Sequence, residues 1–284
     1  MRRFLRHYLL ALQFFTRLPV TGRLATWVGY SPQMLRASAA HFPGVGWLVG
    51  SLVAALSALL WLGLPAGGFS PLVVAAMGTA FGVLLTGAFH EDGLADVADG
   101  LGGSLARERA LEIMKDSRVG AFGAIAVSLA LLVKVALVAQ LASMGLTVLC
   151  ACLFLAHVVS RTWPLLLIRL LPHVGDAANS KSKPLADQIS VAALGVALLW
   201  CLSALVLTVF AWSQSSELMP DQSGAHVLFG LLGALGASAL AFGWMARWFA
   251  KRLQGFTGDC LGATQQMCEL AFYLGFLLGW GALT

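Results

Sequence analysis

The stretch FGAIAVSLALLVKVALVAQLAS, residues 122–143, decides the fold class, because Lys134 is its one charged residue. A run of about 20 mostly apolar residues is long enough for a helix to cross the hydrocarbon core of a bilayer. Strands of a membrane β-barrel would instead alternate apolar and polar residues, and this stretch does not. It therefore predicts a transmembrane helix.

The composition of the whole chain agrees with this interpretation. Of 284 residues, 59% are hydrophobic and 11% are charged, and the mean hydropathy is +0.83, whereas a soluble domain is about 25% charged. So few charged residues cannot cover a water-soluble globule, which excludes a soluble enzyme and a disordered chain. Since no linker or long repeat divides the sequence, we expect one all-α domain over 1–284, a polytopic helical membrane bundle.

The distribution of Lys and Arg predicts which loops share a side of the membrane. Basic residues occur in 1–43, 91–121, 172–188 (Lys181 and Lys183) and 247–265, whereas 65–71, 144–146 and 213–225 contain none. By the positive-inside rule, the N-terminus faces the cytoplasm and the C-terminus faces outside, as in a multi-pass protein of the cell (inner) membrane. The seven predicted spans are 44–64, 72–90, 122–143, 147–171, 189–212, 226–246 and 266–283.

The N-terminal segment 1–18 predicts a further helix of a different kind. At 100° per residue its polar side chains share one face, which is typical of an amphipathic helix lying at the membrane surface. This face comprises Arg2, Arg6, Gln13, Thr16 and Arg17. The alternative is a cleaved leader, but no small-residue cleavage site follows the apolar stretch.

Cysteines and glycines indicate packing. Five cysteines, Cys150, Cys152, Cys201, Cys260 and Cys268, form no CxxC pair, so we expect reduced thiols and neither a disulfide framework nor a zinc site. Gly46–Gly50, Gly78–Gly82 and Gly275–Gly279 have GxxxG spacing, which predicts close helix contacts. No Lys/Arg run with interleaved aromatic residues is present, so nucleic-acid binding is not expected.

The acidic segment HEDGLADVADG, residues 90–100, predicts the site of chemistry. On a helix, Asp92, Asp96 and Asp99 project from one face, where their charges repel unless a cation lies between them. All-oxygen ligands favour Mg²⁺ or Mn²⁺ over softer metals. The alternative is a solvated acidic helix end, but 87–103 contains no Lys or Arg. A zinc protease is excluded, because Leu94 stands where HExxH needs its second histidine.

Other segments supply cations and glycines that suit a phosphate. Lys115, Asp116 and Arg118 precede the third predicted span, and GFTGD (255–259) contains Gly258 and Asp259. Within the predicted spans, Lys134 and Arg161 should face the bundle interior or a wet cavity. We expect Arg161 to contact a phosphate. Together with the acidic helix, these residues are the parts that phosphoryl transfer requires.

Five motifs together resemble the cobalamin synthase family, the adenosylcobinamide-GDP ribazoletransferases of bacteria and archaea. They are FFTRLPV (14–20), FPGVGWLVG (42–50), HEDGLADVADGLGG (90–103), MKDSRVGAFG (114–123) and GFTGDCLGATQQ (255–266). The resemblance covers nearly the whole chain, and the motifs occur in the family's order. DVADG (96–100) also has the spacing that opens the motif of CDP-alcohol phosphotransferases, although the rest of that motif is absent.

The resemblance implies a Mg²⁺-dependent enzyme that joins adenosylcobinamide-GDP to α-ribazole or its 5′-phosphate and releases GMP. The implied metal ligands are Glu91, Asp92, Asp96, Asp99 and Asp116. The implied phosphate-binding residues are Lys115, Arg118, Arg161, Gly258 and Asp259. The implied proton acceptor is a carboxylate of the cluster, Asp92 or Asp96, or else His90. The alternatives are a CDP-alcohol phosphotransferase of phospholipid synthesis and a secondary transporter, and the sequence leaves a homo-oligomer open.

Overall fold

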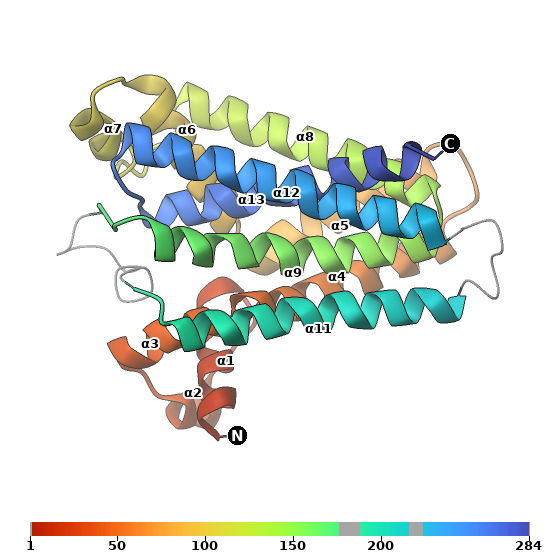
Figure 1. The fold of residues 1–284 in the computed structure, drawn as a ribbon, viewed down its shortest axis with the longest axis horizontal. Helices are drawn as coiled ribbons and strands as arrows, with labels where there is room; N and C mark the ends of the chain where they lie inside the picture. The colour runs from red at the N-terminus through yellow and green to blue at the C-terminus, as the bar shows by residue number, and fades with distance from the viewer. Residues whose placement is uncertain (1, 176–187, 216–223, 284) are drawn as a thin grey trace.

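The computed structural model describes residues 2–175, 188–215 and 224–283, so Lys181 and Lys183 of the predicted basic loop lie outside the described residues. The described segments fold into helices (Figure 1). They are α1 (Arg2–Phe15), α2 (Gly22–Val28), α3 (Pro32–Ser38), the 3₁₀ turn η1 (Ala39–His41), α4 (Phe42–Gly63), α5 (Ser70–Thr86), α6 (Phe89–Gly103), α7 (Arg107–Ile113), α8 (Ala121–Ser143), α9 (Leu146–Leu170), α11 (Val191–Ser215), α12 (Gly224–Arg252) and α13 (Gly258–Gly281).

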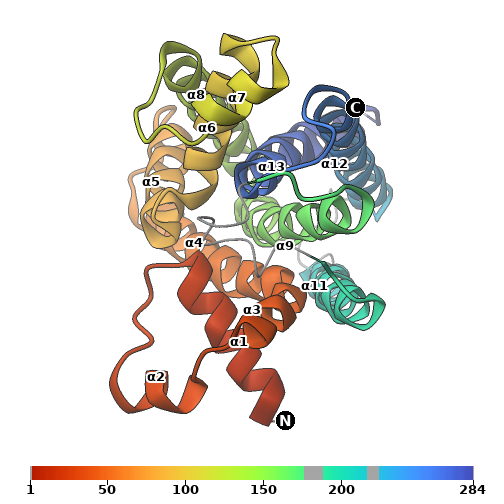
Figure 2. The same cartoon turned by 90° about the vertical axis from the view of Figure 1, so that its left-hand side faces the viewer.

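The long helices form a bundle around α9, which contacts α4, α8, α11, α12 and α13 (Figure 2). Most of α9 is buried, whereas α8 and α11 expose large apolar side chains such as Leu132 and Val206. An exposed apolar surface of this kind needs a hydrocarbon environment to be stable. The structure therefore confirms an all-helical membrane bundle.

Of the seven predicted spans, not all correspond to a described helix that is long and apolar enough to cross a membrane by itself. Five described helical segments are long and apolar enough to cross, or six if the bent pair of α5 and α6 counts as one span. The predicted span 72–90 ends early, because the chain bends by 88° between α5 and α6. The predicted span 266–283 is part of α13, which falls outside the five and contains Gln265, Gln266 and Glu269.

The two ends of the bundle differ in character. In Figure 1 the α1–α3 segment, α6 and α7 lie at one end, and the C-terminus lies at the other. The first end includes the basic residues of α7 and of the last turn of α12, Lys251 and Arg252. This arrangement agrees with the alternation of basic loops along the sequence, while the side of the membrane that each end faces stays a prediction.

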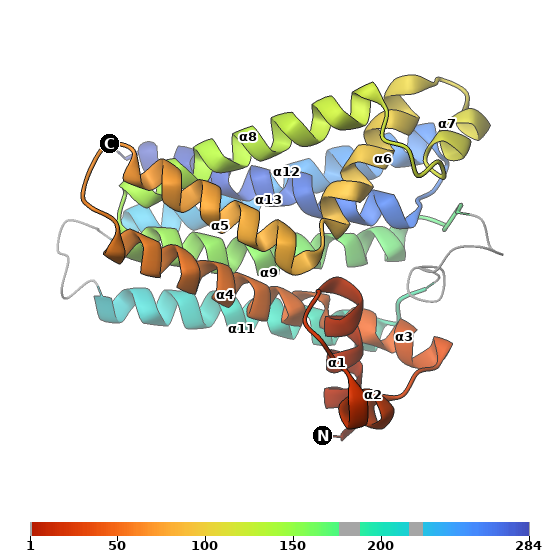
Figure 3. The ribbon, with the colours of Figure 1, turned by 180° about the vertical axis from the view of Figure 1, so that it is seen from behind.

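The predicted N-terminal amphipathic helix is present as α1. It runs across the direction of the long helices at the basic end of the bundle (Figure 3). Leu10, Leu12 and Phe15 are buried, and the helix packs against α3 and α4. Its buried apolar face fixes the position of the residues that follow it, which matters for the site described below.

The predicted glycine contacts are confirmed at helix crossings. A Cβ atom on Gly46 of α4 would collide with the carbonyl oxygen of His157 on α9. A Cβ atom on Gly275 of α13 would collide with the backbone of Gly233 on α12. Only glycine permits such close backbone approach, so these pairs set the packing of α4 on α9 and of α12 on α13. All five cysteines are free thiols, as expected.

A buried ion pair connects α8 to α13 inside the bundle. Lys134 Nζ lies 2.7 Å from Glu269 Oε1, and the side chains are 7% and 1% exposed. Tyr273 donates a hydrogen bond of 3.0 Å to the same oxygen, and Gln265 Nε2 donates one of 2.8 Å to Oε2. The prediction that Lys134 faces the interior is confirmed, and its partner is the one acid of α13 that lies deep in the bundle.

Candidate active site

The site begins at the bend between α5 and α6. Gly87 and Ala88 both adopt positive φ angles, 67° and 58°, which end one helix and start the next in a new direction. A left-handed conformation is easy for glycine and unusual for alanine. The bend lays the acidic helix α6 against the first turns of α13, where Gly93 meets Asp259. A Cβ atom at position 93 would lie 2.7 Å from the Asp259 carbonyl oxygen.

Three carboxylates gather where α6 meets α13. Asp92 is exposed, Asp96 is half-buried one turn further along, and Asp259 stands in the first turn of α13. Burial and the negative charges of nearby acids, Asp259 first among them, raise the pKa of Asp96 to about 7. Burial also raises the pKa of Asp259. Burial is the larger cause of both shifts, and repulsion between the neighbouring carboxylates adds to it.

Asp92 and Asp259 open onto a cleft of about 600 Å³, here called the acidic cleft. Its walls come from α1 and the residues that follow it, from the α5–α6 bend and from α13. They include Arg17, Thr86, Gly87, Phe89, Asp92 and Asp259. Segments separated by more than 240 positions in the sequence therefore form one depression at the basic end of the bundle.

Arg17 is a residue of this cleft that the sequence reasoning placed only on the polar face of α1. Its backbone N–H donates to the carbonyl of Leu85 over 2.8 Å, and its exposed guanidinium lies against Gly87, where a Cβ atom would collide with it. The FFTRLPV motif contains Arg17 and was the available signal. An exposed arginine in a cleft that also contains two carboxylates is suited to bind an anionic group such as a phosphate.

Asp99 has a structural position instead. Its two carboxylate oxygens accept hydrogen bonds from the backbone N–H groups of Gly120 and Gly123, at 2.7 and 2.8 Å. These are donors at the start of α8, which have no partner within their own helix. The buried carboxylate thus caps α8 and fixes α6 beside it, which separates Asp99 from the acids that line the acidic cleft.

His90 and Glu91 point into the protein. Glu91 is buried, and its Oε1 accepts a hydrogen bond of 2.8 Å from Gln266 Nε2 on α13. Its Oε2 is buried without a hydrogen-bond partner. His90 is 5% exposed and faces an interior space, described below, rather than the acidic cleft. The structure therefore separates these two residues from Asp92, although the sequence places them side by side.

The loop before α8 lies at the same end of the bundle but forms its own pair. Arg118 donates to both oxygens of Asp116, with distances of 2.6 to 3.2 Å. The Arg118 guanidinium lowers the pKa of Asp116 to about 2. Lys115 is exposed beside them. Asp116 thus uses its carboxylate on a neighbouring cation, and the structure does not bring it into the group formed by Asp92, Asp96 and Asp259.

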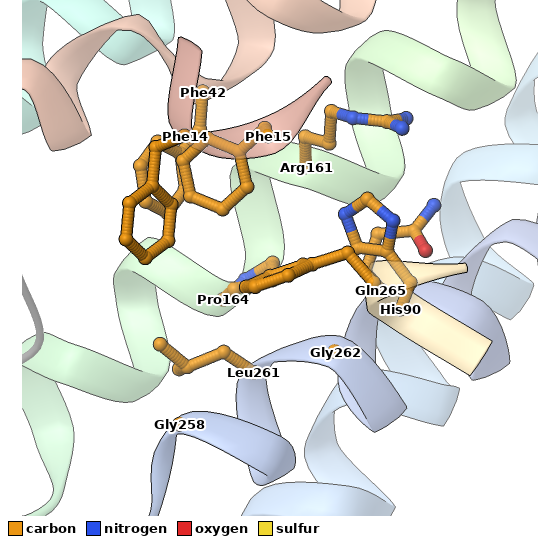
Figure 4. Close-up of a pocket in the computed structure, with 11 residues that line it drawn as sticks. Phe14, Phe15, Phe42, His90, Arg161, Pro164, Gly258, Leu261, Gly262 and Gln265 are labelled. Atoms are coloured by element: carbon orange, nitrogen blue, oxygen red, sulfur yellow. The ribbon is translucent and has the colours of Figure 1, made fainter. Parts of the chain in front are cut away.

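Arg161 lies deeper, on α9. Its Nη1 donates to the His157 carbonyl oxygen over 2.9 Å, and its Nε is buried without a hydrogen-bond partner. It lines a second space, here called the inner pocket, together with Phe14, Phe15, Phe42, Phe89, His90 and Gln265 (Figure 4). Gly258 borders both the inner pocket and the acidic cleft. The predicted phosphate contact at Arg161 therefore faces the inner pocket.

The carboxylates by themselves do not form a complete metal cage. Among the residues that the structure describes, no three His, Cys, Asp or Glu side chains are arranged to hold a metal ion. Mg²⁺ commonly binds one or two carboxylates and completes its shell with water and substrate phosphate oxygens. The donor chemistry of Asp92, Asp96 and Asp259 fits that mode of binding.

We expect Asp96→Asn to raise the thermal stability of the protein near pH 8. The pKa of Asp96 in the folded protein is about 7, above its ordinary value of 3.8. Ionisation therefore opposes folding above pH 7, and this penalty fades as the pH falls toward about 4. The measurement is the melting temperature of wild-type and variant protein in detergent with a chelator, near pH 8 and near pH 4. Glu112→Gln on exposed α7 is the control, and a gain of equal size near pH 4 would contradict the charge argument.

Comparison with known proteins gives a consistent result. The family described as cobalamin-5-phosphate synthase matches residues 7–277. A protein of Albidiferax ferrireducens is 69% identical over 279 residues, which cover 98% of this chain and 100% of the relative. A relative from Polaromonas naphthalenivorans is 59% identical (97% and 98% covered), and one from Vibrio cholerae is 41% identical (94% and 91% covered). All three are named adenosylcobinamide-GDP ribazoletransferase. No solved structure matches the chain.

Proposed function

Since the chain belongs to the cobalamin-5-phosphate synthase family, and is thus a transferase of cobalamin biosynthesis, we propose the reaction that it performs. It transfers the cobinamide-phosphate group of adenosylcobinamide-GDP to α-ribazole or its 5′-phosphate, and it releases GMP. Family membership favours this reaction over the CDP-alcohol phosphotransferase and the secondary transporter that the sequence left open.

The observation that carries the proposal is that two carboxylates and an arginine line one cleft, with a third carboxylate close by. Asp92, Asp259 and Arg17 all line the acidic cleft, and Asp96 lies close enough to the two acids to interact with their charges. A diphosphate needs positive charge on both sides during transfer. We propose that Asp92 and Asp259 hold Mg²⁺, with Mn²⁺ as a substitute, and that Arg17 binds a phosphate oxygen. When bound, the metal supplies positive charge that balances the charge of the diphosphate.

The transfer itself requires an acceptor for one proton. The hydroxyl oxygen of the ribazole attacks the phosphorus that carries cobinamide, a new P–O bond forms, and the P–O bond to GMP breaks. The hydroxyl proton passes to a base. Asp96 is the candidate we favour, because it lies one turn of α6 beyond Asp92 and close enough to Asp92 and Asp259 to interact with their charges. His90 faces the inner pocket, away from the acidic cleft.

The location of the acidic cleft also indicates which side of the membrane it faces. The cleft lies at the end of the bundle that includes α7 and the last turn of α12, where basic residues gather. By the positive-inside rule, this end faces the cytoplasm. We propose an inner-membrane enzyme whose site receives its nucleotide substrate from the cytoplasm and whose C-terminus lies outside.

The test is an assay of the purified protein in liposomes. It contains adenosylcobinamide-GDP and α-ribazole, with and without Mg²⁺, and follows both GMP and the corrinoid product. We expect both products to form only with the metal. Product formation at full rate in the presence of a chelator would contradict the proposed metal. Absence of product from folded protein with Mg²⁺ or Mn²⁺ would contradict the proposed reaction.

A further inference from the structure

The inner pocket has walls of aromatic rings contributed by three helices. Phe14 and Phe15 come from α1, Phe42 from α4 and Phe89 from α6. The Phe15 and Phe42 ring centroids are 4.1 Å apart at 72°, and those of Phe15 and Phe89 are 5.3 Å apart at 88°. Edge-to-face rings of this kind form a surface on which another flat ring can pack. Pro164 and Leu261 extend the apolar lining.

Two polar residues that line the inner pocket, Arg161 and Gln265, have buried atoms without hydrogen-bond partners. In Figure 4, Phe14, Phe15 and Phe42 lie on one side, and Arg161 and Gln265 lie on the other. Arg161 is 4% exposed and Gln265 is 1% exposed. Arg161 Nε, a donor, and Gln265 Oε1, an acceptor, are both buried without hydrogen-bond partners. Buried polar atoms in native proteins are almost always paired, so this pair of orphans indicates a ligand with one acceptor and one donor.

The inner pocket is adjacent to the acidic cleft. Phe14, Phe89 and Gly258 line both spaces. A ligand held between the phenylalanines could therefore extend a polar group toward Asp92, Asp259 and Arg17. This is the arrangement that an acceptor nucleoside needs, since its ring must be held while its hydroxyl reaches the reacting phosphate.

We propose that the inner pocket binds the aromatic base of the acceptor nucleoside, with its ribose directed to the acidic cleft. The inference rests on the proposed function. The base of ribazole is a benzimidazole with one unsubstituted ring nitrogen, which would accept a hydrogen bond from Arg161 Nε. A guanine base fits the same space less well, because several polar atoms along its edge would face phenylalanine, proline and leucine.

Binding requires a local movement. In this structure about 30 Å³ of the inner pocket is open, room for no more than one or two water molecules. The rings of Phe14 and Phe15 must therefore turn aside when the base enters. Side-chain rotations of this size are common when ligands bind. Phe14 is the less buried of the two and also borders the acidic cleft, so it forms the wall through which the base would pass.

The test fills the inner pocket with a larger side chain and compares the KM values of the two substrates. We expect Leu261→Trp to raise the KM for α-ribazole by at least about 10-fold, with the KM for adenosylcobinamide-GDP nearly unchanged. Direct binding of α-ribazole to the full-length protein in lipid nanodiscs should weaken by the same factor. Leu240→Trp is the matched control, because Leu240 is 77% exposed on the outer face of α12.

The outcomes separate this proposal from the proposed function. If wild-type protein forms GMP and corrinoid product, the reaction stands, and an unchanged KM and affinity for α-ribazole in Leu261→Trp would overturn the base-binding site. A selective rise in the KM for adenosylcobinamide-GDP would also overturn it, in favour of the guanine base. If Leu261→Trp does not fold, Phe14→Ala provides the same test by removing a stacking ring, with the same expected direction and the same contradicting result.

Discussion

Alanine at position 92 is expected to lower turnover by at least about 100-fold while the protein still inserts and folds. Asp92 is exposed and lines the acidic cleft, so its removal takes little from the packed interior. The proposed site, however, loses one of two carboxylates for Mg²⁺. The measurement is the rate of GMP release as a function of Mg²⁺ concentration, and we expect the half-maximal concentration to rise together with the fall in rate.

Asp96→Asn provides the contrast for this experiment. If Asp96 is the proton acceptor, its loss should lower the rate by about 10²- to 10⁴-fold and remove the pH dependence near neutrality, with the Mg²⁺ dependence unchanged. Glu112→Ala, which removes an exposed acid of α7, is the control and should keep the wild-type rate. Near-normal turnover in both Asp92→Ala and Asp96→Asn would contradict the acidic cleft as the site of transfer.

Methionine in place of Lys134 is expected to destabilise the protein by about 3–5 kcal/mol. The substitution leaves the buried carboxylate of Glu269 without its cation, while Tyr273 and Gln265 still donate to it. Most of the free-energy loss comes from that unpaired charge and not from the missing lysine. The measurement is the free energy of unfolding in detergent, with helix content as the signal that reports unfolding.

The double variant Lys134→Met with Glu269→Gln tests that explanation. Glutamine keeps the size of the side chain and removes the charge, so the double variant should recover a large part of the stability lost in Lys134→Met. The two sites are in contact, and their effects on stability should therefore be strongly non-additive. Additive losses in the double variant would show that the ion pair is not what Lys134 contributes.

The sequence predicted the apolar helices well, because their length and composition are local properties. The last predicted span, 266–283, belongs to α13, which is less apolar than the five helices that meet the length and hydropathy criteria. The polar residues of that helix find their partners on other helices, as Glu269 does with Lys134 on α8. The bend at Gly87 and Ala88 was also missed, since a continuous apolar-to-acidic pattern gives no sign of a turn between two helices.

For the site, the sequence located the acidic segment but could not assign its members. The acidic residues of 90–99 cannot be told apart by sequence, yet their positions differ. Asp92 lines the acidic cleft, Glu91 accepts a hydrogen bond from Gln266, and Asp99 caps α8. Those assignments depend on which helix each side chain faces. Asp259, predicted to bind phosphate, lies beside the acids of α6. Arg17 was not predicted as a cleft residue. Tertiary packing brings both residues to α6, and the sequence around each gives no sign of it.

The position of α13 has a consequence for the order in which the enzyme matures. This helix provides Asp259 to the acidic cleft and Gln265 to the inner pocket, yet it is synthesised after α1, α4, the α5–α6 bend, α6 and α9, which form the other walls. A nascent chain that has released only the earlier helices thus has no complete site. A charged Glu269 is costly in lipid unless it is paired, so its ion pair with Lys134 connects the placement of α13 in the bundle to that of α8.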